Sequence, residues 1–502
     1  MIADFRYLCN MQRKFLLNLI LLLSLNLLVK PFWILGIDLT VQNTVGSADY
    51  GFYFSLLNFS FLFNILLDFG ITNFNNRNIA QNRQLLEKHF SNIVFLRFLL
   101  AVVYLVITFG VAFLIDYNPA QLKMLIFLTF NQFLLSFILY LRSNIAALHL
   151  FRVDSFISVL DRLLMILICS VLLWGNVTDQ VFRIEWFVYA QTIAYLITFL
   201  VAFYYVVRRA GFKNPGLKLP FSLMIIKQSS PYALLVLLMM LYYKVDSVML
   251  ERMLTNGHHQ AGVYATAYRL LDAANNISYL FSVLLLPIFA RMIKLRQPVN
   301  DVIRLALNLL VTVSLTVLVF SLVYAEELMQ TIYPQHQDET LILFQERIEQ
   351  SAFIFQILMG CFVSMSVTYV FGTLLTANGS MRKLNMVAAS GMILNVVLNL
   401  LLIPQLESVG SAIASLITQG LTSLAQVFIA LRLFKLKPSK KDVFKYTGFI
   451  AGLLAITIIK PEVSSNWIVN AALLTGASIV WAMILRLVSI RRFIEIVRMR
   501  EE

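Results

Sequence analysis

Apolar segments recur along the whole chain, and they limit what the chain can fold into. Each holds roughly 17 to 28 residues, and an α-helix needs about 20 apolar residues to cross the roughly 30 Å of hydrocarbon in a bilayer. Of the 502 residues, 60% are hydrophobic and 13% are charged, against about 45–50% and about 25% in soluble domains. The sequence therefore predicts an all-α, polytopic membrane protein.

Positive charge is distributed unevenly around these segments. If the chain begins in the cytoplasm and crosses the membrane fourteen times, thirty of the forty Lys and Arg residues lie on the cytoplasmic side, five lie outside and five lie within spans. Cytoplasmic loops of membrane proteins carry such an excess. We therefore expect fourteen transmembrane helices and two cytoplasmic termini, and we assign the net charge of +14 to these loops rather than to nucleic-acid binding. The predicted spans are residues 15–37, 50–74, 91–115, 121–142, 153–175, 184–207, 228–250, 261–290, 305–325, 351–376, 384–404, 409–431, 443–459 and 467–485.

A short pattern, Gly-x4-Gly-x-Tyr, recurs between the first and second predicted helix of each half, at an offset of 211 residues. Internal repeats are common in transporters. The repeat predicts a six-helix lobe at residues 1–212, a second six-helix lobe at 213–436, and a terminal helix pair with a basic cytoplasmic tail at 437–502. Its glycines are candidate hinges, with ordinary turn chemistry as the alternative. They are Gly46, Gly51, Gly257 and Gly262.

Signatures of catalysis and of nucleotide binding are absent from the sequence. There is no Gly-x4-Gly-Lys-Ser/Thr phosphate loop, no HExxH and no CxxC, so we expect no catalytic residue, no cofactor and no metal site. The pair His258-His259 is interpreted as part of a loop, because a metal site needs more ligands. The outer loops are short, which disfavours a membrane-bound polysaccharide polymerase or ligase.

Ionisable residues inside the predicted spans are the candidate functional groups. A charge near the bilayer centre costs roughly 2.5–3.5 kcal/mol, so it usually faces a wet cavity or a partner. A cavity lined by four such cations would be net positive even with acids nearby, and would attract phosphate-bearing substrates. The candidate cavity cations are Lys30, Arg162, Lys244 and Arg269. Arg97, close to the cytoplasmic end of its span, is instead expected to snorkel.

Acids and amides complete the candidate set. The acids could serve either ion coupling or charge pairing; they are Asp68, Asp246 and Asp272. Asp272 follows Arg269 by three residues, a spacing that allows a pair along one helix face. The amides suit sugar hydroxyls, although amides in spans also hold helices together. They are Asn58, Asn64, Asn275 and Asn276.

Three runs of this sequence resemble the polysaccharide-repeat (O-antigen type) flippases of the multidrug/oligosaccharidyl-lipid/polysaccharide exporter superfamily. They are VGSADYGFYFSLLNFSFLFNILLDFGI, KVDSVMLERMLTNGHHQAGVYATAYRLLDAANNISYLFSVLLLPIFARM and LLTANGSMRKLNMVAASGMILNVVLNLLLIPQLESVGSAIASLI.

The resemblance covers essentially the whole chain. It implies a V-shaped, pseudo-two-fold pair of six-helix bundles in the bacterial inner membrane. The implied activity is transfer of an undecaprenyl-pyrophosphate-linked oligosaccharide to the outer leaflet by alternating access, for surface polysaccharide such as lipopolysaccharide. The implied contacts of the pyrophosphate are Lys30, Lys244 and Arg269; coupling would use Na⁺ or H⁺, and polysaccharide polymerase machinery is an implied partner.

Two other transporter classes of the same superfamily stay open. A peptidoglycan-precursor flippase shares the fourteen-helix count but is usually richer in arginine within the first lobe. A cation-coupled multidrug exporter commonly has twelve helices and an acid-dominated site, unlike the mixed set of charges here.

Overall fold

The computed structural model describes residues 28–29, 32–72, 84–148, 150–175, 180–210, 219–335, 339–436, 440–459 and 464–487. These residues form helices joined by short turns, and no strand occurs among them. The predicted all-α class is confirmed. The chain divides into two compact units, Met1–Val248 and Met249–Glu502, called unit 1 and unit 2 below.

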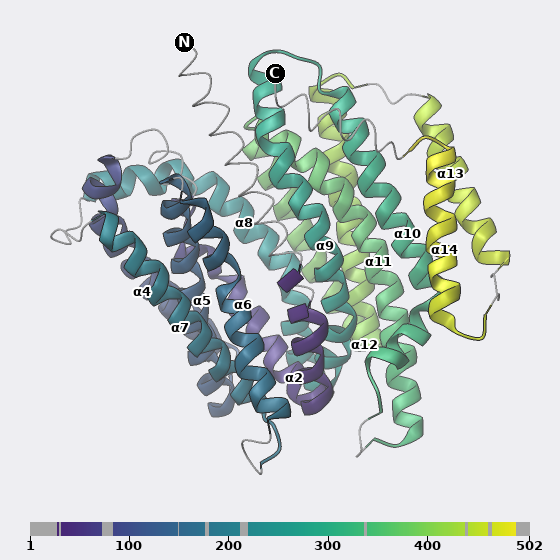
Figure 1. Cartoon of the computed structure of the whole chain (residues 1–502), viewed down its shortest axis with the longest axis horizontal. Helices are drawn as coiled ribbons and strands as arrows, with labels where there is room; N and C mark the ends of the chain where they lie inside the picture. The colour runs from purple at the N-terminus through teal and green to yellow at the C-terminus, as the bar shows by residue number, and fades with distance from the viewer. Residues whose placement is uncertain are drawn as a thin grey trace. The chain divides into compact units, whose positions relative to one another are not determined.

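Unit 1 is built around α5 (Figure 1). This helix contacts α2, α4, α6 and α7. Its start at Pro119 follows from local chemistry: the Asn118 side chain accepts from the backbone N–H of Gln121, and the Gln121 side chain accepts from that of Asn118. The elements are η1 (Trp33–Asp38), α2 (Leu39–Leu62), η2 (Asn64–Leu67), α4 (Gln84–Leu114), α5 (Pro119–Ala147), α6 (Phe151–Trp174), α7 (Ile184–Ala210) and α8 (Leu219–Met253), which crosses the boundary between the units.

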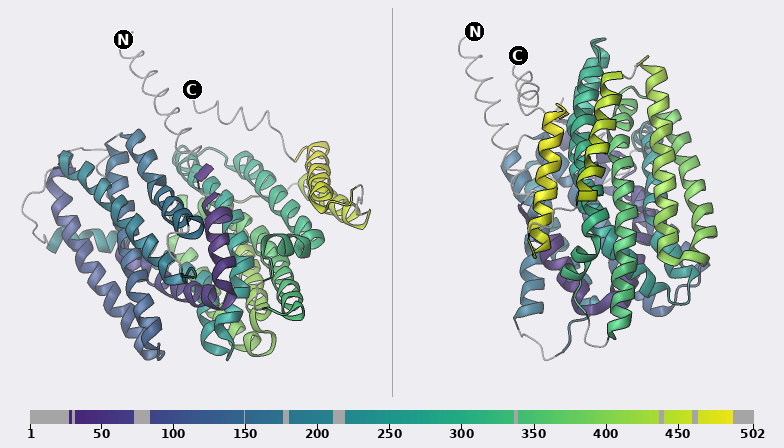
Figure 2. Two further views of the ribbon diagram at one scale, coloured as in Figure 1. Left: turned by 60° about the horizontal axis from the view of Figure 1, so that its bottom comes forward. Right: turned by 90° about the vertical axis from the view of Figure 1, so that its right-hand side faces the viewer.

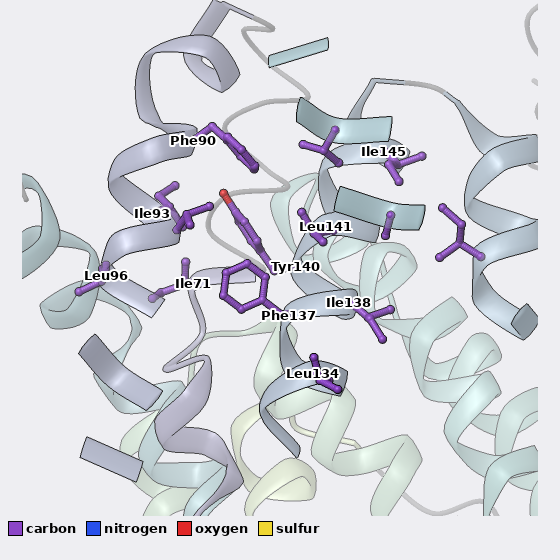
Figure 3. Close-up of a cluster of buried hydrophobic side chains, with 14 of the residues drawn as sticks. Ile71, Phe90, Ile93, Leu96, Leu134, Phe137, Ile138, Tyr140, Leu141 and Ile145 are labelled. Carbon is purple, nitrogen blue, oxygen red and sulfur yellow. The ribbon is translucent and has the colours of Figure 1, made fainter. Parts of the chain in front are cut away.

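The core of unit 1 is an aromatic and aliphatic cluster between α4 and α5 (Figure 3). Phe90 and Tyr140 stack there with ring centroids 6.3 Å apart, and Phe137 meets Tyr140 edge to face. Elsewhere α4 exposes large apolar side chains such as Val102 and Val106. Such an exposed apolar face is expected of a helix that contacts lipid.

In unit 2, α11 is the central helix and packs against α9, α10 and α12. The pair α13–α14 lies beside α10, as Figures 1 and 2 show. Its buried residues, among them Phe449 and Leu474, form a cluster with Val319 and Tyr324 of α10. The elements are α9 (Gly257–Lys294), α10 (Asn300–Ile332), α11 (Leu341–Ala377), α12 (Met381–Leu433), α13 (Lys440–Ile459) and α14 (Trp467–Ile484).

Two helices bend sharply where the sequence predicted loops. In α2 the bend is at Gly46, whose φ of 84° and ψ of 169° belong to a region that is essentially restricted to glycine. In α12 the bend is at Glu407, with φ of 50° and ψ of −131°. Each bend separates two helices of one predicted pair.

The second predicted helix is shorter than expected. It ends at Leu62 rather than near residue 74, and a 3₁₀ turn at Asn64–Leu67 follows. Positive φ angles at Phe69 and Gly70 keep the chain out of a helix there. Hydropathy alone does not reveal this break, because most residues of the segment are apolar.

Nine helices among the described residues are long and apolar enough to cross a membrane. Neither α2 nor α9 is one of these nine, although both were predicted as spans. Most of the first predicted span lies outside the described residues. A multi-pass membrane protein is thus confirmed, and the count of fourteen stays a prediction.

Candidate functional site

A π-helical turn, η1, places two side chains in the interior of unit 1. Such turns insert an extra residue into the helical register and are frequent at functional sites. Trp33, at the start of η1, stacks on Phe187 of α7 with ring centroids 5.7 Å apart and an interplanar angle of 6°. Asp38, at its end, is buried and accepts a hydrogen bond of 3.0 Å from the Tyr50 hydroxyl.

Arg162 of α6 lies against the same turn. Its guanidinium carbon is 5.2 Å from the ring centroid of Trp33 and 5.9 Å from that of Tyr195 in α7. Its Nε is 3.6 Å from a carboxylate oxygen of Asp161, and 24% of its side chain is exposed. Trp33, Asp38, Asp161, Arg162 and Tyr195 are called the Arg162 cluster below.

The Arg162 cluster combines a cation, two carboxylates and aromatic faces. A guanidinium presents five donors in a fork that matches phosphate oxygens, and indole and phenol rings offer an apolar face with a polar edge. Asp38 and Asp161 outnumber Arg162, so these groups alone are not net positive. Lys30, three residues before Trp33, lies outside the described residues.

Arg97 occupies a different environment from Arg162. It is 1% exposed, and its NH1 is 2.6 Å from Asp68 Oδ1. Its NH2 donates to the carbonyl and the hydroxyl of Ser136 at 2.9 and 2.7 Å, and its guanidinium carbon is 4.8 Å from the Tyr140 ring centroid. The expectation that Arg97 snorkels is wrong, because α5 and the turn after η2 supply partners inside the protein.

Asp68 is engaged on several sides. Besides Arg97 it accepts from the backbone N–H and from the hydroxyl of Thr72, one turn along the chain. It follows η2, where Asn64 donates to Gln132 of α5 at 2.5 Å. These contacts place Asp68 and Asn64 at the helix break, in a cluster separate from that of Arg162.

The predicted residues of α8 lie near α2. Asn58 of α2 is buried and donates to the Ser247 hydroxyl at 2.8 Å. Ser247 adjoins Asp246, which is 1% exposed. Lys244, one turn earlier, is half-buried and its carbonyl accepts from Ser247. The structure thus brings Asn58 beside the charged stretch of α8.

The remaining predicted residues belong to α9 of unit 2. Arg269 and Asp272 are half-buried on this helix. Asn275 donates to the Tyr369 hydroxyl of α11 at 3.2 Å, whereas Asn276 is exposed and donates to the carbonyl of Asp272 in its own helix. Asn275 therefore joins two helices, as amides in spans commonly do.

The candidate hinges occupy different kinds of position. Gly46 forms the bend in α2, and Gly257 is the first residue of α9. Gly51 and Gly262 are buried within helices. His258 and His259 lie in the first turn of α9 rather than in a loop, and the His258 Nδ1 is 3.8 Å from a Glu251 oxygen.

Four members of the Arg162 cluster were not among the candidate site residues: Trp33, Asp38, Asp161 and Tyr195. Asp38 directly follows the expected end of the first span at residue 37, so it was not counted among the charges inside spans. A usable signal was the apolar stretch that continues beyond Gly36, since a carboxylate within a continuing helix needs a partner.

Comparison with known proteins is consistent with this architecture. A family model described as "Polysaccharide biosynthesis protein" matches residues 15–293, more than half of the 502 residues. No curated protein sequence matches the chain.

Three solved structures illustrate the likeness of fold. One is the lipid II flippase MurJ in an inward closed conformation, with a TM-score of 0.67 at 13% identity, covering 95% of this chain and 100% of that one. Another is an inward-facing multidrug resistance MATE family transporter of the MOP superfamily, with a TM-score of 0.63 at 14% identity and coverage of 82% and 94%. The third is the Vibrio cholerae MATE transporter VcmN in a bent form, with a TM-score of 0.54 at 14% identity and coverage of 85% and 97%.

At these identities the structures show a shared fold and nothing more specific. The sequence match is the stronger finding, because it runs from residue 15 of unit 1 to residue 293 in α9. The chain therefore belongs to the polysaccharide biosynthesis protein family, and its fold is that of MurJ and the MATE transporters.

Proposed function

We propose that this protein is a flippase. Its substrate is an undecaprenyl-pyrophosphate-linked oligosaccharide repeat unit, which it moves from the inner to the outer leaflet of the bacterial plasma membrane for surface polysaccharide assembly. Polar sugar and pyrophosphate groups cannot cross hydrocarbon unshielded, because each unsatisfied polar group costs several kcal/mol. A flippase shields the head group while the lipid tail stays in the bilayer.

The observation that carries the proposal is the placement of Arg162. It lies in an apolar helix, between the rings of Trp33 and Tyr195, with a quarter of its side chain exposed. Arg97, by contrast, is enclosed by Asp68 and Ser136. A cation that stays accessible inside a membrane protein suits an anionic ligand, and a guanidinium suits pyrophosphate in particular.

Other predicted groups have supporting parts in this proposal. Lys30, Lys244 and Arg269 are further candidate contacts for pyrophosphate. Alternating access would use the predicted glycine hinges, of which Gly46 has the backbone geometry of a bend. Asp68, Asp246 and Asp272 are the candidates for coupling to Na⁺ or H⁺ or for charge pairing, and Asp68 pairs with Arg97.

The proposed placement in the membrane follows from the charge distribution. Most Lys and Arg residues would lie on the cytoplasmic side together with both termini, as the positive-inside rule predicts. The oligosaccharide would then be released where the surface polymer is assembled, and polymerase machinery is the proposed partner there.

The test is transport by purified protein in proteoliposomes. We expect wild-type protein to move radiolabelled lipid-linked oligosaccharide to the outer leaflet. Arg162→Ala removes a charge-assisted contact of about 1.5–3 kcal/mol, and at 1.4 kcal/mol per tenfold this lowers initial transport by roughly 10- to 150-fold. Arg162→Lys should recover part of the rate. Arg208→Ala, at the exposed end of α7, is the matched control.

Three substrates separate the transporter classes. Transport of lipid II in place of the oligosaccharide would indicate a peptidoglycan-precursor flippase, for which the MurJ-like fold is the supporting observation. Transport of a cationic dye alone would indicate a multidrug exporter. Oligosaccharide transport at the wild-type rate by Arg162→Ala would remove Arg162 from the substrate site.

A further inference from the structure

The second half of α12 carries a buried polar face inside unit 2. At helical spacing from Ser411 to Gln426 this face presents hydroxyl and amide groups, all at most 8% exposed. At about 1.5 Å per residue the face is roughly 22 Å long, which is most of the hydrocarbon thickness of a bilayer. Its members are Ser411, Ser415, Thr418, Gln419, Thr422 and Gln426.

Part of this face is satisfied by the protein itself. Ser411 donates to Asn399 Oδ1 at 2.8 Å, and Asn399 donates to Asn395 Oδ1 at 3.1 Å, so these bonds join the two halves of α12. Thr422 donates to the carbonyl of Thr418 at 2.8 Å. Polar contacts of this kind commonly hold membrane helices together.

Five other polar atoms of this region have no hydrogen-bond partner within the part of the protein that the structure describes. They are Asn395 Nδ2, Thr418 Oγ1, Gln419 Oε1 and Gln426 Oε1 of α12, and Thr368 Oγ1 of α11. Each belongs to a residue at most 7% exposed. An unsatisfied polar group inside a membrane protein costs several kcal/mol, so five in one region call for a ligand that supplies hydrogen bonds.

Glycine lets the helices approach closely at this face. A Cβ placed at Gly372 of α11 would lie 2.6 Å from Gln426 Oε1 and 3.9 Å from the Thr368 methyl, so Gln426 Oε1 packs directly against Gly372 and meets no donor there among the described residues. The unpartnered atoms include a donor and several acceptors and carry no charge. A neutral ligand that both donates and accepts satisfies them, and water is the smallest such ligand.

We infer that α11 and the two halves of α12 enclose a file of bound water molecules along the polar face from Ser411 to Gln426. This internal hydration belongs to unit 2, whereas the Arg162 cluster belongs to unit 1, and it goes beyond the proposed flippase function.

One end of the file meets an ionisable group. Ser408, one turn before Ser411, donates to Gln260 Oε1 at 2.6 Å, and Gln260 donates to the Glu407 carboxylate at 2.5 Å. Gln350 of α11 donates to both Gln260 and Ser408 at 3.1 Å. Through Gln260, hydrogen bonds thus link Ser408, at the start of the second half of α12, to the carboxylate at the bend.

The test is X-ray hydroxyl-radical footprinting of the full chain in lipid nanodiscs. Radiolysis of bound water oxidises the side chains around it, even where bulk solvent is excluded. With each rate normalised to the intrinsic reactivity of the side chains, we expect residues 411–426 to be oxidised at least threefold faster than residues 471–484 of α14, where the hydroxyls of Thr475 and Ser478 donate to carbonyls of their own helix. Equal rates for the two segments would overturn the inference.

Substitutions make the test specific. Thr418→Val keeps the side-chain shape and removes one water partner, and Gln426→Leu removes another; each should lower oxidation of residues 411–426 by half or more. Thr198→Val is the control, because the Thr198 hydroxyl donates to a carbonyl of its own helix at 2.8 Å. Oxidation left unchanged by both substitutions would also overturn the inference. No substrate is needed, so the result is independent of the transport assay.

Discussion

The ion pair between Arg97 and Asp68 allows a quantitative test of which buried cations are structural. Asp68→Ala leaves a guanidinium that is 1% exposed without its carboxylate partner at 2.6 Å. Removing one partner of a buried pair costs about 3–5 kcal/mol. The two bonds to Ser136 and the contact with Tyr140 remain. We therefore expect a loss near the lower end, about 3 kcal/mol.

A double-mutant cycle separates the pair from its surroundings. Arg97→Met removes the charge and keeps much of the side-chain volume, and the carboxylate it leaves is 23% exposed and still bonded to Thr72. Replacing a whole buried pair by apolar groups is often close to neutral. The double variant should thus be more stable than Asp68→Ala alone, with a coupling energy of about 2 kcal/mol or more.

The assay is reversible unfolding of the purified protein in mixed micelles, followed by tryptophan fluorescence and repeated for the wild type, both single variants and the double variant. A coupling energy below about 0.5 kcal/mol would refute the reasoning, because independent sites add within that margin. Arg162→Met serves as the contrast. Arg162→Met should lower the stability of the wild type less than Asp68→Ala does. Arg162 is partly exposed, and its contact with the adjacent Asp161 is longer, at 3.6 Å.

Three further predictions concern the bends and the first turn of α9. Gly46→Ala forces a side chain into a glycine-only conformation and should destabilise the protein by about 1–3 kcal/mol. The control Gly420→Ala lies in the regular part of α12 with open space around it, and it should be neutral or stabilising by about 1 kcal/mol. Equal shifts of the unfolding temperature for the two variants would contradict this. Burial and the charge of Arg347 lower the pKa of His259, so the unfolded chain binds a proton at this site more readily than the folded protein does. The stability of the folded protein should therefore be highest above the ordinary histidine pKa near 6.5. It should fall as the pH drops through and below that value. His259→Gln should flatten that dependence in thermal unfolding measured between pH 5 and 8, and an unchanged slope would count against it. Glu407→Ala removes the acceptor of the Gln260 side chain. It should speed amide hydrogen exchange in the first turn of α9 and leave exchange in α5 unchanged. Protection of this turn equal to that of the wild type would show that the carboxylate does not stabilise it.

The sequence alone determined the class of the protein and most helix positions. Predicted spans 153–175 and 184–207 correspond to α6 at Phe151–Trp174 and α7 at Ile184–Ala210. Both predicted loops at residues 46 and 407 fall on bends. The physical reason is local: a segment that must satisfy its backbone groups within a bilayer has helix as its only solution, and glycine or a run of polar residues marks where the helix turns.

Tertiary structure decided what each charge does. Arg97 and Arg162 each lie within an apolar span, yet Arg97 is enclosed by Asp68 and Ser136 whereas Arg162 lies on Trp33 and Tyr195. The break after Leu62 was hidden as well, because it lies in a mostly apolar segment. Partners of a buried charge come from helices tens of residues away, so the spacing along one helix carries no record of them, and the packing of the helices determines whether a cation is paired or accessible.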